Sequence, residues 1–318
     1  MAWLVKLCRS MHIAGSSRRS YHGLQKIFID FCEDFGFDPL TVSEDELSMA
    51  AAHYVMGHTV KSVDSYMSAL QDMYNNAGAG PLPRGPKYLH FVRGLKRLLG
   101  AADEVVRTKA LGIEELQAIL GSLDMTDVDD VSFGAEICVA FFLALRTEDH
   151  TDGRLRWGDV FPQADGSIEY LLPPGKSVRR YRRVATEARR GLLSAGEWLA
   201  RLAALVPQAA LAPNMPVFVS AVRTAQGGMR FPPRSRSKFV ARFKRAVQDV
   251  LGFSPALYAG YSLRRGGVTE MLTRGVSVPV VKQHVGWSAT SDAVMAYYDH
   301  SGRAQMRIPT AAMGRHLL

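Results

Sequence analysis

Apolar residues recur at helical spacing through the first hundred positions of the chain. The clearest run falls at i, i+3, i+4, i+7 and i+11, with a glycine directly after it as a helix end: Leu24, Ile27, Phe28, Phe31, Phe35 and Gly36. A second run has a similar spacing: Val63, Tyr66, Leu70 and Tyr74. A Gly- and Pro-rich break at 75–86 then precedes a short helix over residues 88–99. This pattern predicts a small helical bundle.

The pattern changes after residue 110. A new amphipathic helix is predicted around residues 116–123, and residues 135–145 are apolar on every side, which indicates a helix buried in a core. The turn signal Asp165-Gly166 predicts a β-hairpin. Its first strand alternates at Ile168, Tyr170 and Leu172, and its second is expected from Lys176 to Val184.

Helices return in the last third of the chain. Ser194 and Glu197 form a capping box that begins a helix through Leu205. Another helix ends at Gly252 and has five apolar positions: Val240, Phe243, Val247, Val250 and Leu251. Three more are predicted over residues 262–274, 277–285 and 288–298. Three aspartates are predicted to lie in a solvated turn and to hold no metal: Asp127, Asp129 and Asp130.

These elements predict a mainly α protein with a small β-sheet, an α+β arrangement in its second half. With 318 residues, the chain is long enough for two cores. We expect an N-terminal helical domain at 1–100, a linker at 101–110, and a second domain with a C-terminal tail at 111–318.

Positive charge is concentrated in one segment. The chain has 39 Lys and Arg against 30 Asp and Glu, a net charge of +9. Residues 171–250 hold 16 of the basic residues and only 3 of the acidic ones. Such a segment is typical of proteins that bind a polyanion, although a solvated charged face has the same composition.

Composition argues against other classes of protein. No apolar run approaches the roughly 18 residues that span a bilayer, and the apolar N-terminus is too short for a secretion signal. The three cysteines form no CxxC pair, and the histidines show no metal-binding spacing, so neither a disulfide framework nor a zinc site is expected. We therefore expect an intracellular protein without a membrane partner.

Four side chains have the chemistry to hold and attack a DNA phosphodiester. That reaction needs fixed donors around the negative oxygens and a nucleophile in line with the leaving oxygen. Arginine suits the first task because its guanidinium stays charged and offers two parallel donors. Arg146 follows the buried helix, and Arg264 lies in the first turn of a later one, where free N–H groups favour an anion. Trp287 offers an indole N–H, and Tyr297 offers a phenol.

The order of these residues resembles the catalytic motifs of the tyrosine recombinases, the phage-integrase family that includes Cre. The family's Leu-Arg-x-x-Glu motif is matched by Leu145-Arg146-Thr147-Glu148, and its His-x-x-Arg motif by Tyr261-Ser262-Leu263-Arg264. Gly286-Trp287 matches the next pair, with the tryptophan that Cre has. Lys176 lies where the family has a lysine on a β-hairpin. Residues 291–297 also resemble the end of the recombinase of DIRS-type mobile elements.

The resemblance implies a site-specific recombinase or integrase of double-stranded DNA. Tyr297 would attack the scissile phosphate and form a 3′-phosphotyrosyl bond, without metal or cofactor. Lys176 would protonate the leaving oxygen, and Glu148 would orient its neighbours. Three side chains would stabilise the transition state: Arg146, Arg264 and Trp287. The resemblance further implies a core-binding domain, a catalytic domain, and a homo-tetramer on DNA that forms from monomers or dimers. The protein would be associated with DNA in a nucleus, or in a prokaryotic cytoplasm.

Two positions depart from the family pattern. Tyr261 stands where the family usually has histidine, and a tyrosine hydroxyl donates to a phosphate oxygen but is a poor general base at neutral pH. The tyrosine is also doubled. Spacing favours Tyr297 as the nucleophile, whereas Tyr298, in Tyr-Asp-His, matches the family's common Tyr-Thr-His ending.

Other interpretations remain open. Each candidate has a structural alternative, such as a helix-end charge for Arg146 or core packing for Trp287. The chain could also be a DNA-binding protein of this fold whose catalysis has decayed, a type IB topoisomerase, or an enzyme like the telomere resolvases. In every case, contact with the DNA backbone is expected from eight basic residues: Arg93, Lys96, Arg97, Arg179, Arg180, Arg242, Lys244 and Arg245.

Overall fold

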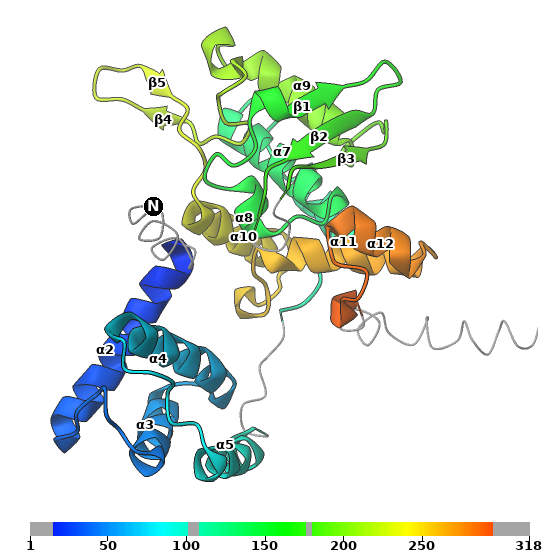
Figure 1. Ribbon diagram of the computed structural model, residues 1–318. Helices are drawn as coiled ribbons and strands as arrows, with labels where there is room; N and C mark the ends of the chain where they lie inside the picture. The colour runs from blue at the N-terminus through cyan, green and yellow to red at the C-terminus, as the bar shows by residue number, and fades with distance from the viewer. Residues whose placement is uncertain (1–14, 101–107, 176–179, 295–318) are drawn as a thin grey trace, which may run out of the picture. The chain divides into compact units, whose positions relative to one another are not determined.

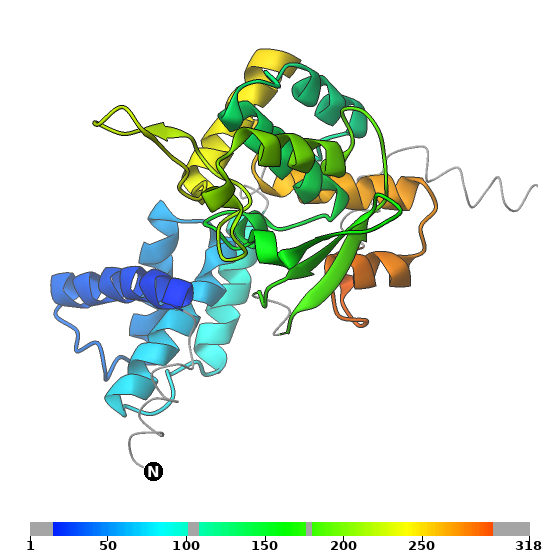
Figure 2. The same ribbon diagram turned by 90° about the horizontal axis from the view of Figure 1, so that it is seen from above.

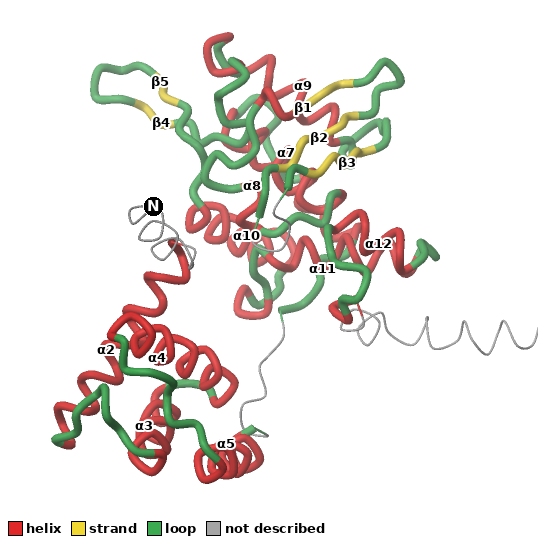
Figure 3. The backbone as a smooth tube through the Cα atoms, in the orientation of Figure 1, coloured by secondary structure: helices red, strands yellow, loops and turns green. Residues whose placement is uncertain are grey.

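The computed structural model describes residues 15–100, 108–175 and 180–294 (Figure 1). The chain divides into two compact units, Met1–Val106 and Arg107–Leu318, and each has its own hydrophobic core. The described residues are mainly helical with a few short strands, as Figure 3 shows. The predicted mainly α fold with a small β-sheet is therefore confirmed.

The N-terminal unit is a helical bundle. Its helices are α2 (Gly15–Phe35), α3 (Glu44–Gly57), α4 (Val63–Ala77) and α5 (Pro86–Leu99). Helix α2 ends where the sequence predicts, because Gly36 takes the left-handed conformation (φ 71°) that glycine tolerates. Ser43 begins α3 through a capping box with Glu46. In the core, the rings of Tyr54 and Tyr66 stack with their centroids 4.2 Å apart.

The second unit combines seven helices and five strands among its described residues. The helices are α6 (Ile113–Gly121), α7 (Val128–Phe142), α8 (Thr147–His150), α9 (Ala195–Leu205), α10 (Arg236–Leu251), α11 (Tyr261–Thr273) and α12 (Val278–Val285). Helix α7 is buried along most of its length, which confirms the core helix predicted from its apolar sequence. In Figure 1, the larger sheet and α9 lie in the upper part of this unit, and α10, α11 and α12 lie in the lower part.

The larger sheet is antiparallel, in the order β1 (Val160–Pro162), β2 (Ile168–Leu172), β3 (Arg182–Thr186). Every second residue of β2 is buried, as the alternation predicts. Strand β3 is displaced from its predicted range, since it begins at Arg182 and continues to Thr186. A second hairpin, β4 (Val222–Arg223) and β5 (Met229–Arg230), is absent from the predicted elements and projects from the unit in both Figure 1 and Figure 2.

Two local predictions are wrong. The three aspartates do not form a solvated turn: Asp127 caps α7 by accepting the N–H of Asp130, and the other two lie in the first helical turn. The helix predicted at 288–298 is also absent from the described part of that range, which has only a 3₁₀ turn at Asp292–Val294. Side-chain bonds hold this backbone in other conformations, as Lys282 donates to the carbonyl of Ala289 (2.7 Å).

Within the described ranges, no helix combines the length and the apolar character that a bilayer crossing requires.

Candidate active site

Arg146 is placed by a sharp change of direction at the end of α7. The helix ends at Phe142, and Ala144 then takes the left-handed conformation, with φ 47°. Such a backbone is unusual for a residue with a side chain and is often found at functional sites. Arg146 follows as the N-cap residue of α8, with its backbone N–H donating to Asp149 Oδ2 (2.9 Å). Its side chain is half-buried.

Arg264 approaches the same turn from α11. Its side chain is fully buried, and its Nη1 donates to the carbonyl oxygen of Ala144 at 2.6 Å. Its Nη2 donates to the carbonyl oxygen of Val285 at the end of α12 (3.2 Å). The centroid of the Trp287 ring lies 5.1 Å from its guanidinium carbon, a cation–π contact. One guanidinium therefore joins the α7 turn, the end of α12 and the tryptophan of the motif.

Glycines allow α11 to come this close. A Cβ added to Gly267 would collide with the carbonyl oxygen of Phe141, and one added to Gly260 would collide with the side chain of Thr147. Since Thr147 directly follows Arg146, this packing sets the start of α11 against the start of α8. The structure thereby brings the Arg146 and Arg264 segments together, although they are more than 100 positions apart in the sequence.

A third arginine, which the sequence analysis did not single out, belongs to this group. Arg182 begins β3 and donates to the carbonyl oxygen of His284 in α12. Burial lowers the pKa of Arg182 to about 10, and the positive charges of Arg264 and Arg146 lower it further, whereas the carboxylate of Asp149 raises it. Arg182 still carries its charge at neutral pH, so three arginines share the site. No feature of the sequence distinguishes Arg182 from its basic neighbours in the hairpin.

His284 lies at the same junction. Its Nε2 is 3.0 Å from the carbonyl oxygen of Phe142, and its side chain is partly buried. Burial lowers the pKa of His284, and the hydrogen bond to Phe142 opposes this effect, while Arg182 and Arg264 add to it. The imidazole is therefore neutral at pH 7.

Two open clefts adjoin these arginines. The first, here the Arg146 cleft, has a volume of about 830 Å³ and is lined by Arg146, Thr147, Glu148, Asp152, Ser235, Arg236, Ser237, Val240, Ala259, Gly260 and Tyr261. The second, the Trp287 cleft, has a volume of about 980 Å³. It includes four basic residues and two aromatic ones: Arg180, Arg182, Arg183, Lys282, Tyr181 and Trp287. Tyr261, in the family's histidine position, is 42% exposed at the Arg146 cleft.

Two acidic residues, Glu148 and Asp149, lie close to Arg146 in the sequence and have different positions in the structure. Glu148 is exposed at the rim of the Arg146 cleft, whereas Asp149 accepts the backbone N–H of Arg146 and its charge acts on Arg182. In an Arg-x-x-Glu motif the acid stands three residues after the arginine, and that position here is Asp149. Its position three residues after Arg146 is the sequence signal for it.

Several predicted residues lie elsewhere or outside the described ranges. Lys176, Arg179, Tyr297 and Tyr298 fall outside the described residues. Of the expected DNA contacts, Arg93, Lys96 and Arg97 are exposed on α5, where Lys96 pairs with Asp64 (2.8 Å). Arg180 is exposed just before β3. On α10, Arg245 is exposed and Lys244 half-buried, whereas Arg242 pairs with Asp130 and lies over the Phe133 ring.

No group of three or more His, Cys, Asp or Glu side chains suited to a metal ion occurs within residues 15–100, 108–175 and 180–294.

Known proteins resemble this chain in structure and not detectably in sequence. No protein-family model matches it, and no curated protein sequence does. A lambda integrase dimer bound to a COC′ core site matches with a TM-score of 0.61 and 18% identity, over 95% of this chain and 96% of that one. The Tn1549 transposon integrase with circular intermediate DNA matches with a TM-score of 0.62 and 14% identity, over 95% and 97%.

A third structure, the XerH site-specific recombinase bound to palindromic difH substrate, has a TM-score of 0.56 and 16% identity, over 85% of this chain and 72% of that one. At these identities the likeness shows the fold. The chain therefore has the fold of the tyrosine recombinases, and its Arg264 side chain bonds to the turn that precedes Arg146.

Proposed function

We propose that this protein is a site-specific DNA recombinase or integrase that cuts and rejoins DNA through a covalent tyrosine intermediate. The observation that carries the proposal is the bond from Arg264 to the turn that precedes Arg146, with Trp287 over the same guanidinium. Motif residues far apart in the sequence meet at one place, next to two clefts. The shared fold supports the proposal, since the matching structures are a recombinase and two integrases bound to DNA.

The chemistry follows from the charges at the site. Tyr297 loses its phenolic proton to solvent and attacks the scissile phosphorus, so its phenolic oxygen bonds to phosphorus while the bond to the 5′ oxygen breaks. Lys176 supplies the proton that makes this leaving oxygen a 5′-hydroxyl. Arg146 and Arg264 balance the charge that develops on the other phosphate oxygens, and Arg182 adds a third positive charge nearby. The reverse reaction, with a new 5′-hydroxyl as nucleophile, rejoins the strand.

Access to Arg264 requires movement. In this structure its side chain has no exposed surface, whereas Arg146 is partly exposed. A phosphate can therefore contact Arg146 first and reaches Arg264 only after a neighbouring side chain moves. Trp287 is the side chain whose ring lies over the guanidinium, and its displacement would free its own indole N–H to donate to the phosphate.

The wider arrangement belongs to the same proposal. Residues 1–100 would form a core-binding domain that contacts DNA through the basic face of α5, residues 101–110 a linker, and residues 111–318 the catalytic domain. The chain would assemble as a tetramer during strand exchange and act on DNA inside the cell. Its motifs are Cre-like, and its last motif resembles the recombinases of DIRS-type mobile elements.

The test is covalent capture on DNA. Duplexes selected by binding from a random pool are nicked near each possible cut, so that cleavage releases a short fragment and traps the protein on the strand. We expect a protein–DNA adduct in denaturing gels that Tyr297→Phe abolishes and Tyr298→Phe retains. An adduct that persists in Tyr297→Phe and disappears in Tyr298→Phe would move the nucleophile by one residue.

A second function is favoured by one observation, the tyrosine in the family's histidine position. Tyr261 lines the Arg146 cleft, where the family has a histidine that can accept a proton. A tyrosine hydroxyl is a poorer proton acceptor than a histidine ring at neutral pH. Tight, salt-sensitive DNA binding without an adduct on any nicked duplex would identify a DNA-binding protein whose catalysis has been lost. Relaxation of supercoiled plasmid without sequence preference would instead identify a topoisomerase.

A further inference from the structure

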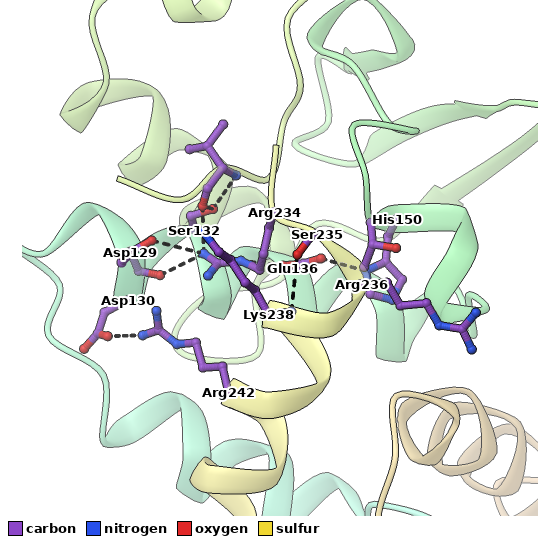
Figure 4. A network of polar contacts seen from close by, with 12 residues as sticks. Asp129, Asp130, Ser132, Glu136, His150, Arg234, Ser235, Arg236, Lys238 and Arg242 are labelled. Atoms are coloured by element: carbon purple, nitrogen blue, oxygen red, sulfur yellow. Dashed lines mark hydrogen bonds and ion pairs between the residues drawn. The ribbon is translucent and has the colours of Figure 1, made fainter. Parts of the chain in front are cut away.

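A buried carboxylate in α7 connects two of the segments that line the Arg146 cleft. The Glu136 side chain has no exposed surface. Its Oε1 lies 2.9 Å from Nδ1 of His150, and its Oε2 lies 2.9 Å from Nε of Arg234 (Figure 4). These three side chains come from α7, the last residue of α8, and the segment that leads into α10.

Arg234 is fixed from several directions. It is 3% exposed, and its Nη2 donates to the carbonyl oxygens of Val219 (2.8 Å) and Asp129 (3.2 Å). Burial lowers the pKa of Arg234, and the carboxylates of Glu136 and Asp129 oppose this effect. Ser132 donates to the same carbonyl of Val219 (2.8 Å). The guanidinium is therefore held by α7 and by the segment before the β4–β5 hairpin.

His150 is fixed as firmly. Its ring has no exposed surface and packs edge-on against Phe239 of α10, with the centroids 4.7 Å apart. Because Nδ1 points at the Glu136 carboxylate, this nitrogen carries the hydrogen. His150 ends a helix of four residues, and Arg146 is the N-cap of that helix. Holding His150 therefore limits where Arg146 can lie.

Arg234 has the same relation to the other side of the cleft. Ser235 follows it as the N-cap of α10, and the first residues of α10 line the Arg146 cleft. Asp152 adds direct links between the two segments, since its N–H donates to the carbonyl oxygen of Arg234 (2.9 Å) and its Oδ1 accepts the N–H of Arg236 (3.3 Å).

Stability alone does not explain this group. Removing charges from water costs free energy, and a buried ion pair can often be replaced by packed apolar residues with no loss of stability. Buried ionic groups are better suited to selecting one arrangement among several, because each bond demands a direction. In this chain the group lies directly behind a cleft that carries one of the two motif arginines.

We infer that Glu136 is a positioning residue: through His150 and Arg234 it sets the spacing between Arg146 and the start of α10, and thus the geometry of the cleft that takes the phosphate. The expected effect on catalysis rests on the proposed function. The effect on the spacing between Arg146 and the start of α10 rests on the structure alone.

The test separates position from stability. In the triple variant Glu136→Met, His150→Phe, Arg234→Met, every charge of the group is replaced by an apolar side chain of similar size. We expect its unfolding midpoint and DNA affinity to stay near those of the unmodified protein. The single-turnover rate of adduct formation on nicked duplex should fall about 100-fold, because a small misplacement of reacting groups can slow a reaction by that factor. Hydrogen exchange should become faster over residues 146–152 and 234–238. Glu270→Gln, which removes the ion pair of Glu270 with Arg274 on α11, is the matched control and should change none of these.

The outcomes test the positioning role of Glu136 and the proposed function separately. A stable triple variant with the unmodified adduct rate overturns the positioning role. If the unmodified protein forms no adduct, the proposed function fails, and hydrogen exchange still decides: unchanged exchange in both segments overturns the inference. If the triple variant does not fold, Glu136→Gln is measured at a temperature where it is folded, with the same expectation for the rate and for exchange.

Discussion

The two units of this protein bury different kinds of side chain. Among the described residues, the second unit holds every buried charged residue and every buried Ser, Thr and His: Ser132, Glu136, Thr147, His150, Thr151, Thr186, Ser194, Ser220, Arg234, Ser262, Arg264 and Arg265. The described part of the N-terminal unit has a core of apolar and aromatic residues, and its ion pairs are exposed, as in Lys87–Asp45. Both units fold around apolar burial, so buried charge is not needed for a stable core here.

The proposed chemistry explains why buried charge is found in the second unit. Arg264 and the Glu136 group lie around the Arg146 cleft, where fixed positive charge is needed to bind a phosphate. Exposed charges, such as those on α5, suit a different task, since they attract the DNA backbone without holding one geometry. The comparison predicts that equivalent changes have large effects in the second unit and small ones in the first.

The largest effect is expected from Arg264→Lys. A lysine keeps one positive charge but cannot bond the carbonyls of Ala144 and Val285 in the same way, so it cannot hold the α7 turn and α12 together. We expect adduct formation on nicked duplex to fall about 1,000-fold, the range seen when a transition-state donor is lost. Arg274→Lys, at the exposed end of the same helix, is the control. A decrease of only a few-fold would mean that Arg264 does not act on the phosphate.

Next in size is the same substitution at two helical glycines, a closely packed one in the second unit and an exposed one in the N-terminal unit. Gly267→Ala introduces a Cβ against the carbonyl of Phe141 and should destabilise the protein by about 3 kcal/mol, as overpacking of a core does. Gly94→Ala, in α5, has no neighbouring atom within 4 Å and should stabilise its helix by about 0.5–1 kcal/mol. Urea unfolding measures both. Equal effects of the two substitutions would contradict the close packing of α11.

A smaller effect is expected from pH, through His284. Its pKa is lowered in the folded state, so below its ordinary value of 6.5 the unfolded chain binds a proton that the folded protein does not. The free energy of unfolding should therefore decrease as the pH falls from 6.5 toward the folded-state pKa. His284→Gln should make this decrease shallower in urea titrations between pH 7.5 and 5, whereas His22→Gln, at an exposed position of α2, should leave it unchanged. Parallel curves for all three proteins would exclude a contribution of His284.

The smallest effects concern two buried thiols, one in each unit. Burial raises the pKa of Cys32 to about 11 and that of Cys138 to about 12, so both are protonated at neutral pH and weakly nucleophilic. Alkylation by iodoacetamide at pH 8 should therefore be slow at both and should require opening of the surrounding unit. Mass spectrometry of the two peptides then shows which unit opens more readily. Rapid modification of either cysteine without denaturant would show that its core is not closed as described.

Much of the fold was predictable because its signals are local. Helix α2 ends at Gly36 and α10 at Gly252, as their sequence patterns indicate. Ser194 caps α9 as predicted, but the capping box is incomplete because the Glu197 carboxylate accepts the N–H of Gly191. The pattern failed where side chains bond nearby backbone. The predicted helix after residue 288 gives way to turns in its described part, and the aspartates before α7 cap and begin that helix.

The candidate site was predictable only in part. The motifs identified Arg146, Arg264 and Trp287, which the structure places together. They did not identify Arg182, whose role depends on its contact with His284, about 100 positions away. They also gave no indication of Glu136, which stands within an apolar helix and acquires its partners only when α8 and the segment before α10 fold against it.

Most of the helices, the larger sheet, the basic segment and the motif arginines are evident in the sequence, because periodicity, capping and composition act over a few residues. Which charges are buried and what they face depends on tertiary packing, because burial and ion pairing join segments that are distant in the chain. Arg264 illustrates both: its motif is evident from seven adjacent residues, and its contact with the Ala144 turn exists only in the folded unit.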